Sequence, residues 1–104
     1  MKNSSRHGSK SNLSEEAIAD LGEIVKRIAG DNRTAAEHMG RTIFERTRML
    51  ADFPLAGRVV PEERNPNVRE IIVDPYRVIY ELNAGSPTVD ILRVWHAARG
   101  RPAL

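Results

Sequence analysis

Residues 68–96 read VREIIVDPYRVIYELNAGSPTVDILRVWH, and this stretch decides the fold. It contains three runs rich in Val, Ile and Tyr in which apolar residues alternate, the pattern of half-buried strands. The runs are Val68–Val73, Tyr76–Leu82 and Thr88–Trp95, with His96 closing the last one. Asp74-Pro75 predicts a tight first turn, and residues 83–86 predict the second. Turns this short impose an antiparallel meander.

The middle run shows which side of the sheet is buried. Side chains of a strand alternate between its two faces. One face carries Tyr76, Val78, Tyr80 and Leu82, and the other carries Arg77, Ile79 and Glu81. The first of these faces is apolar and needs cover from another layer.

Two amphipathic helices upstream supply that cover. Ser14 is a good N-cap for the first helix, and Gly30 provides its C-terminal stop. The second helix starts near Thr34 and ends before Phe53-Pro54, because proline cannot continue it. Apolar residues at helical spacing are expected to face inward: Ala17, Ile18, Leu21, Ile24, Val25 and Ile28 in the first helix, and Ala36, Met39, Ile43, Phe44 and Leu50 in the second. Leu55 to Pro66 is expected to be a connector. We therefore predict an α+β fold, an N-terminal helical hairpin packed on a small antiparallel sheet.

The first twelve residues differ from the rest of the chain. They hold Lys2, Arg6 and Lys10 and no acid, and we expect a disordered basic tail or a weak strand near Gly8 to Leu13. Residues 13–104 are expected to form a single domain. Without the tail, 13 basic residues face 14 acidic ones, a net charge of −1, which argues against general nucleic-acid affinity.

Composition excludes several kinds of site. The 104 residues include no cysteine, so disulfides and thiolate zinc sites are impossible. His7, His38 and His96 are too scattered to suggest a metal site, and no phosphate-loop or other cofactor motif occurs. No apolar run approaches the roughly 18 residues that a membrane span needs. We expect a cytoplasmic protein without a metal or cofactor.

The second half of the chain concentrates the residues that could carry chemistry. These are Arg58, Arg69, Glu70, Arg77, Tyr80, Arg93, His96 and Arg99. In a meander they fall on neighbouring strands and can converge. Arginines with a histidine and a tyrosine would suit a phosphodiester, because cations stabilise the charge and His or Tyr can move a proton. The same set would suit an acidic protein surface, or could form a solvated face of ion pairs with neighbouring acids.

Individual positions favour different roles. Arg69 beside Glu70 predicts a cross-strand ion pair at the surface, which contributes little to stability. Tyr80 alternates with core positions, so packing is its expected role. Arg77 follows a turn and favours function, whereas Trp95 fits either the core or a contact. His96 and Arg99 lie where the last strand ends, and we expect them to be the residues most exposed to a partner.

Several segments together resemble toxins of the ParE/RelE superfamily, the plasmid stabilisation proteins of type II toxin–antitoxin modules. The similar segments are residues 14–24, Phe53 to Arg58, Val68-Arg69-Glu70, Tyr76 to Tyr80 and Val94 to Arg99. They occur in the family's order and spacing from about Leu13 to Arg99. The resemblance implies a β-α-α-β-β-β fold, although the chain offers only Lys10-Ser11-Asn12-Leu13, a short and mostly polar segment, where the family has its first strand.

The resemblance also implies partners. Such a toxin is neutralised by a cognate antitoxin, usually of the ribbon-helix-helix type for ParE-like pairs, and it meets operator DNA only through that antitoxin. No membrane partner is implied.

Two activities occur in the superfamily. ParE-like members poison DNA gyrase without a catalytic site, and RelE-like members are endoribonucleases that cleave mRNA on the ribosome. Residues 58–69 lack the lysines on which RelE relies, which counts against that type of cleavage. Other ribonuclease members use a glutamate, an arginine and a C-terminal histidine, which would make Arg77 and His96 catalytic, with Glu62 or Glu63 as a loose match.

The ending Val-Trp-His-x-x-Arg looks more like ParE. The expected function is therefore a non-enzymatic gyrase inhibitor. The residues expected to bind its target or partner are Arg58, Arg69, Arg77, Tyr80, Trp95, His96 and Arg99.

Overall fold

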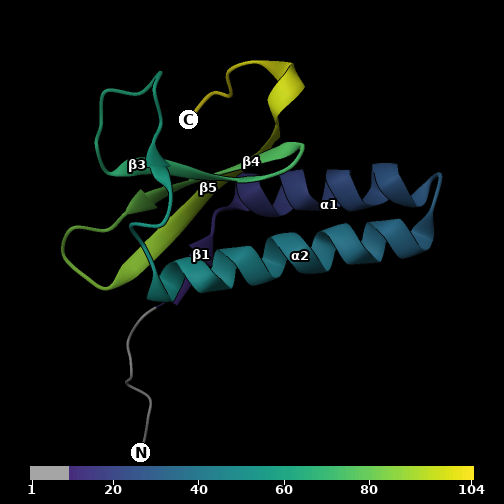
Figure 1. Ribbon diagram of the computed structural model, residues 1–104, viewed down its shortest axis with the longest axis horizontal. Coiled ribbons are helices and arrows are strands. Elements are labelled where there is room, and N and C mark those ends of the chain that lie inside the picture. Colours follow the sequence, from purple (N-terminus) through teal and green to yellow (C-terminus); the bar gives the residue numbers. More distant parts are fainter. Residues whose placement is uncertain (1–9) are drawn as a thin grey trace, which may run out of the picture.

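The computed structural model describes residues 10–104 as two helices packed on one face of a five-stranded sheet (Figure 1). The elements in chain order are β1 (Lys10–Leu13), α1 (Glu15–Ala29), α2 (Arg33–Asp52), β2 (Arg58–Val59), β3 (Val68–Val73), β4 (Tyr76–Leu82), β5 (Thr88–His96) and the 3₁₀ helix η2 (Ala97–Arg99). Residues 1–9, which include Lys2 and Arg6 of the expected basic tail, lie outside the described residues. Neither α1 nor α2 is long and apolar enough to cross a membrane.

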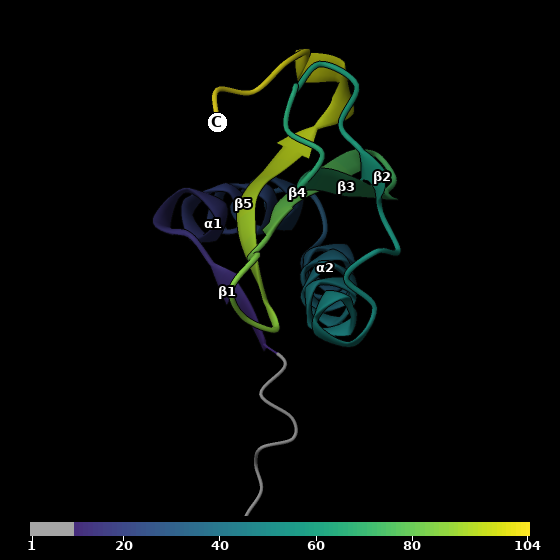
Figure 2. The same ribbon diagram turned by 90° about the vertical axis from the view of Figure 1, so that its left-hand side faces the viewer.

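The helical hairpin forms as its caps predict. The Ser14 hydroxyl accepts a hydrogen bond from the Ala17 N–H and donates one to the Leu92 carbonyl, so the cap also attaches α1 to β5. Asn32 caps α2 in the same way through the Ala35 N–H, and the helix ends at Asp52 as expected. Figure 2 shows the two helices on the same side of the sheet.

The sheet contains the predicted meander and two features that sequence did not predict. Its order is β1-β5-β4-β3-β2, with β3, β4 and β5 antiparallel. The weak strand expected near Gly8 to Leu13 forms as β1, and it pairs with β5 in parallel, a direction that the prediction of an antiparallel sheet did not include. The predicted connector also contains β2, which pairs with β3. β1 and β2 are short edge strands. Their pairing partners lie far away in the chain, so the local sequence gives little indication of how they pair.

The core lies between the sheet and the helices, with a smaller cluster on the opposite face. The main cluster consists of Ala17, Ile43, Leu50, Val73, Tyr76, Val78, Tyr80, Val89, Ile91 and Val94. The smaller one consists of Val60, Val68 and Ile79, where the connector covers the outer face of the sheet. Two predicted core residues are exposed instead: Ile18 at 58% and Phe44 at 49%. Their neighbours Ala17 and Ile43 occupy the inward positions, so the apolar stripe is narrower than expected.

A buried tyrosine fixes the start of the connector. The Tyr80 hydroxyl donates to the Pro54 carbonyl at 2.7 Å and accepts from the Gly57 N–H at 2.9 Å. Arg69 donates to the Gly57 carbonyl at 2.9 Å. A Cβ at position 57 would lie 2.5 Å from the Glu70 carbonyl oxygen, so only glycine fits there. Burial raises the pKa of Tyr80, which keeps its hydroxyl protonated as a donor.

Tyr80→Phe should lower the free energy of unfolding by about 1–3 kcal/mol, because a backbone donor and acceptor lose their partner. Urea denaturation followed by circular dichroism measures the change. Tyr76→Phe is the matched control, since Tyr76 is also buried and no hydrogen bond of its hydroxyl is found within residues 10–104. Equal effects of the two substitutions would contradict the assigned role of the Tyr80 hydroxyl.

Candidate functional site

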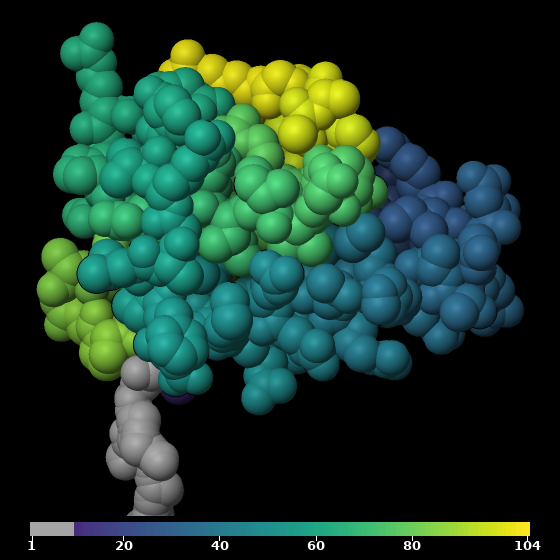
Figure 3. Space-filling model, viewed as in Figure 1, coloured from purple at the N-terminus to yellow at the C-terminus, as the bar shows by residue number. Residues whose placement is uncertain are grey.

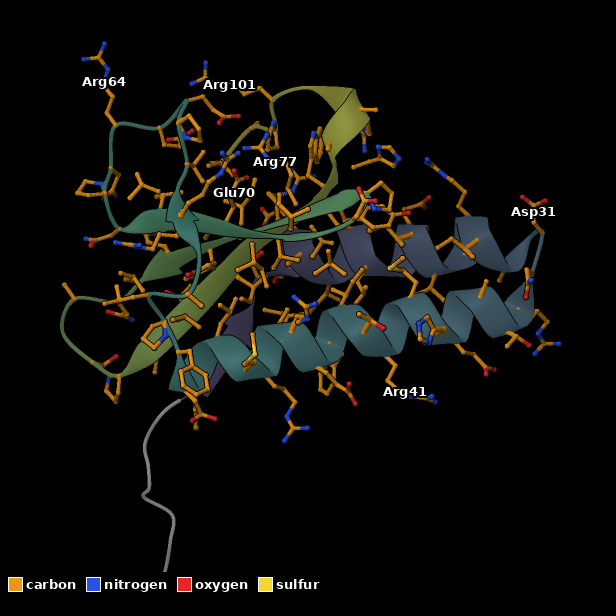
Figure 4. The ribbon with its side chains drawn as sticks, viewed as in Figure 1. Asp31, Arg41, Arg64, Glu70, Arg77 and Arg101 are labelled. Carbon is orange, nitrogen blue, oxygen red and sulfur yellow. The ribbon has the colours of Figure 1, made fainter. Side chains whose placement is uncertain are left out.

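A buried carboxylate organises the face of the sheet that points away from the helices. Glu70 is 1% exposed and lies on β3 opposite Ile79. Its Oε1 accepts from Arg77 Nε at 2.6 Å. Its Oε2 accepts from Arg58 Nε at 2.7 Å and lies 2.6 Å from Arg58 Nη2. Figure 4 shows the Glu70 and Arg77 side chains side by side on this face.

The predicted pairing of Arg69 with Glu70 was wrong. Adjacent residues of a strand point to opposite faces, so Arg69 lies on the helix side, where it binds the Gly57 carbonyl. Arg58 takes its place because β2 brings Arg58 into register with Glu70. The ion pair is therefore made across β2 and β3, and its carboxylate is buried rather than solvated.

Arg77 joins this carboxylate to the connector. Its Nη1 lies 3.0 Å from Glu62 Oε2, while its Nε is bound to Glu70. The hydrogen bond with Glu62 is the main cause that raises the pKa of Arg77, and the same bond lowers the pKa of Glu62. We call Arg58, Glu70, Arg77 and Glu62 the arginine–glutamate network. The charges of its two arginines and its two carboxylates cancel.

A second group of side chains surrounds Trp95. The guanidinium of Arg93 lies 4.6 Å from the centre of the indole ring, and that of Arg99 lies 4.0 Å from it. The indole N–H donates to the Gly100 carbonyl at 3.0 Å. Arg93 also forms a forked pair with Asp20 of α1 at 2.7 and 2.8 Å, and these bonds are the main cause that raises its pKa.

His96 faces the other side of the sheet. Its Nδ1 accepts from the Ala98 N–H at 3.0 Å, so the neutral ring carries its proton on Nε2. The ring packs edge-on against Tyr76, with centroids 5.4 Å apart. Both belong to a cavity of ≈ 560 Å³ between α1 and the end of β5. Its lining consists of Asp20, Glu23, Ile24, Arg27, Tyr76, Val94, His96 and Arg99.

The structure brings the predicted residues together in three places rather than one. Arg58 and Arg77 meet at Glu70, Arg69 and Tyr80 meet at Gly57, and Arg99 meets Trp95. Arg77 and His96 do not converge. The ladder pairs Arg77 with Trp95 and Tyr76 with His96, so alternation places Arg77 and His96 on opposite faces. Within residues 10–104, no group of three His, Asp or Glu side chains is placed to hold a metal ion.

Sequence reasoning missed Asp20. Besides binding Arg93, its carboxylate accepts from the Val94 N–H at 3.0 Å, just beyond the point where β1 stops pairing with β5. Arg101 was also missed, and it donates to the Glu62 carbonyl. Neither residue has a local sequence signal, because each contact joins segments far apart in the chain.

Residues 12–100 match the family model of the ParE toxin of the type II toxin–antitoxin system parDE. The chain belongs to the ParE toxin family. This confirms the resemblance found in the sequence, and it covers both the arginine–glutamate network and the surroundings of Trp95. No curated protein matches the chain.

Two solved structures share the fold of this ParE-family toxin. The chromosomal ParDE toxin–antitoxin system of P. aeruginosa superposes with a TM-score of 0.69 at 20% identity, over 86% of this chain and 97% of that one. The RelBE2 toxin–antitoxin complex of Mycobacterium tuberculosis gives a TM-score of 0.63 at 22% identity, over 86% and 91%. The predicted α+β fold is confirmed at the level of the ParE/RelE architecture.

Glu70→Ala in this ParE-family toxin should lower the free energy of unfolding by about 3 kcal/mol, because Arg77 loses its buried partner and the connector its anchor. Chemical denaturation measures the loss. Glu45→Ala, at an exposed position of α2, is the matched control and should change stability by less than about 0.5 kcal/mol. A Glu70 variant as stable as the control would show that the network does not hold the connector.

Proposed function

We propose that this ParE-family protein is a growth-inhibiting toxin that acts by binding and poisoning DNA gyrase, without catalysis of its own. Residues 13–104 would act as one toxin domain. The family membership supports the toxin role, and the arrangement of Arg77 and His96 supports the absence of catalysis.

The state of Arg77 is the observation that carries this proposal. Its side chain is only 11% exposed, and both its Nε and Nη1 are engaged by carboxylates. The negative charges of Glu62 and Glu70 neutralise the positive charges of Arg58 and Arg77. Arg77 is therefore not available to stabilise the charge of a phosphodiester. His96, the other candidate catalytic residue, lies on the opposite face of the sheet. A general acid and a charge-stabilising cation must both reach the same reacting group, and this pair does not.

The contacts divide the predicted binding residues into two groups. Arg58, Arg69, Arg77 and Tyr80 act through the scaffold, because each holds the connector or its neighbouring strands. We assign the contact with gyrase to Trp95, His96 and Arg99, at the free end of β5 and in the 3₁₀ helix η2. A half-buried tryptophan with two arginines over its ring has the composition of a binding hot spot.

The partner that restrains the toxin would be a cognate antitoxin, as in the two toxin–antitoxin systems with the same fold. We propose the ribbon-helix-helix type, encoded by a short reading frame beside the toxin gene. Operator DNA would be reached only through this antitoxin, since the net charge of −1 over residues 13–104 gives the toxin little affinity of its own.

The purified protein should inhibit supercoiling by DNA gyrase in a dose-dependent way or trap cleaved DNA complexes. Relaxed plasmid and agarose gels measure both effects, and preincubation with the antitoxin should abolish them. Unchanged gyrase activity at a large molar excess of folded protein would refute the proposed target. Cuts in mRNA of translating extracts that vanish with His96→Ala would instead establish the ribosome-dependent endoribonuclease.

Arg99→Ala should weaken gyrase inhibition about tenfold or more, because it removes a cation from the Trp95 surface. The half-inhibitory concentration measures the change. Arg41→Ala is the matched control, since Arg41 is an exposed arginine whose side chain points away from the sheet (Figure 4). Equal inhibition by the two variants would exclude Arg99 from the contact.

A further inference from the structure

The cavity between α1 and the end of β5 has the dimensions of a small-molecule site. Its volume of ≈ 560 Å³ lies within the range of about 300–1,000 Å³ that ligand pockets occupy in proteins. One wall comes from α1, and the other comes from the start of β4, the end of β5 and η2. Figure 3 shows the yellow C-terminal segment meeting the dark blue α1 on the upper right of the molecule. We call this hollow the α1–β5 cavity.

The α1–β5 cavity is lined by a buried tyrosine whose hydroxyl has no partner. Tyr76 is only 7% exposed, and no hydrogen bond of its hydroxyl is found within residues 10–104. The oxygen is not sealed in the core, because in that part of the chain Arg69 Nε is the enclosed side-chain atom that lacks a partner. The hydroxyl therefore opens to the cavity that Tyr76 lines. Buried polar groups are nearly always paired, so this one is available to a ligand.

His96 contributes a second donor beside this tyrosine. Its Nδ1 accepts from the Ala98 N–H, so Nε2 carries the proton of the neutral ring. The rings of His96 and Tyr76 pack edge-on with their centroids 5.4 Å apart, which places both side chains in the same part of the cavity. No protein partner of Nε2 is found among the described residues. One O–H and one N–H donor of the lining are therefore left unused by folding.

Two arginines add positive charge to the same lining. Arg27 lies on α1 and Arg99 in η2, both are exposed, and neither forms an ion pair with an acid of residues 10–104. The guanidinium of Arg99 lies 4.0 Å from the centre of the Trp95 ring. Stacking of this kind uses the face of a guanidinium and leaves its N–H edge free. Such an edge matches the oxygens of a phosphate group in forked hydrogen bonds.

Two carboxylates also line the α1–β5 cavity, and their states determine which charge a ligand should carry. Asp20 is already neutralised, because its two oxygens accept from Arg93 at 2.8 and 2.7 Å. Glu23 is exposed and forms no ion pair within residues 10–104. It faces two unpaired arginines, which leaves one positive charge in excess. The excess charge and the unused donors favour an anionic ligand.

We propose that the α1–β5 cavity binds a phosphate monoester of the size of a nucleotide. The phosphate would lie between the guanidinium groups of Arg27 and Arg99. Its oxygens would also accept from the two unused donors, the Tyr76 hydroxyl and His96 Nε2–H. Four donors from three separate elements would then converge on one group, which is how proteins hold a phosphate without a glycine-rich loop.

The rest of the lining indicates what the phosphate is attached to. An inorganic phosphate fills only a small part of ≈ 560 Å³, so the ligand carries a larger group. Ile24 and Val94 supply apolar surface for that group, and the Glu23 carboxylate can accept hydrogen bonds from its hydroxyls. A sugar, alone or with a base, has both features. The ligand class is therefore a nucleoside monophosphate or a similar sugar phosphate.

The proposed site is separate from the rest of the machinery. Tyr76 belongs to the core cluster on the helix side of the sheet, whereas Arg77 and the arginine–glutamate network lie on the opposite face. Arg27 and Tyr76 take no part in the surface assigned to gyrase. Substitutions at these two positions therefore test the ligand site, and their outcome does not depend on which target the toxin has.

The first experiment measures binding of adenosine monophosphate to the full chain by calorimetry and by NMR. We expect a dissociation constant below about 1 mM. Backbone amide shifts should change at the end of β5, in η2 and around Arg27 of α1. Adenosine, which lacks the phosphate, should bind at least about tenfold more weakly, because it cannot engage the arginines.

The second experiment repeats the titration with variants. Arg27→Ala should weaken binding about tenfold or more, since it removes a charge-assisted contact, and Tyr76→Phe should weaken it about fivefold, since it removes one neutral hydrogen bond. Arg41→Ala is the matched control, because it removes the same charge from an exposed arginine that points away from the sheet (Figure 4). Its affinity should stay within about twofold of the original chain. Thermal melting checks that each variant is folded.

Four results would overturn the inference. The first is no binding of adenosine monophosphate at about 10 mM. The second is an equal loss of affinity in Arg27→Ala and Arg41→Ala, which would mean attraction by net charge alone. The third is a set of amide shifts centred away from the α1–β5 cavity. The fourth is an oligonucleotide with a terminal phosphate that binds where the mononucleotide does not, which would assign the cavity to a nucleic-acid end. Gyrase inhibition is measured separately, so its failure would refute the proposed function and leave this site standing.

Discussion

The burial of Glu70 is the constraint on which the outer half of this protein depends. A carboxylate that is 1% exposed must be paired, because an unpaired charge in the interior is costly. Arg77 on the neighbouring strand and Arg58 in the connector both form ion pairs with this carboxylate. The second contact helps to hold the chain after Gly57 beside β3 as β2. The connector then carries Val60 over Val68 and Ile79, which closes the outer face.

The helical side is attached by comparable polar contacts. Beyond β1, two side chains near the start of α1 continue the hydrogen bonding of the β5 edge. Ser14 binds the Leu92 carbonyl, and Asp20 binds the Val94 N–H together with the Arg93 guanidinium. A strand of only four residues can therefore position a helix of fifteen. The weak sequence signal of β1 does not mean a weak attachment, because Ser14 and Asp20 add side-chain hydrogen bonds to the pairing of β1 with β5.

The sequence was sufficient wherever the deciding interaction is local. Ser14 as a cap, the end of α2 before Phe53-Pro54 and the Asp74-Pro75 turn depend on neighbours in the chain, and all were predicted. The parallel pairing of β1, the strand β2 and the partner of Glu70 depend on residues that meet only after folding. The same limit applies to the site. Residue types directed attention to the second half of the chain, but only the register of β4 against β5 shows that Arg77 and His96 face opposite sides.

The arginines now have a structural explanation that composition could not provide. Arg58, Arg69, Arg77 and Arg93 each direct a guanidinium at a carboxylate or a backbone carbonyl of another segment. A planar fork suits these contacts better than a lysine ammonium does. Most of the positive charge in the second half is therefore used to hold loops against the sheet. Under the proposed function, binding is left to Trp95, His96 and Arg99, at the end of β5 and in η2. A contact surface at that place could change without disturbing the arginine–glutamate network, because none of its three residues belongs to the network.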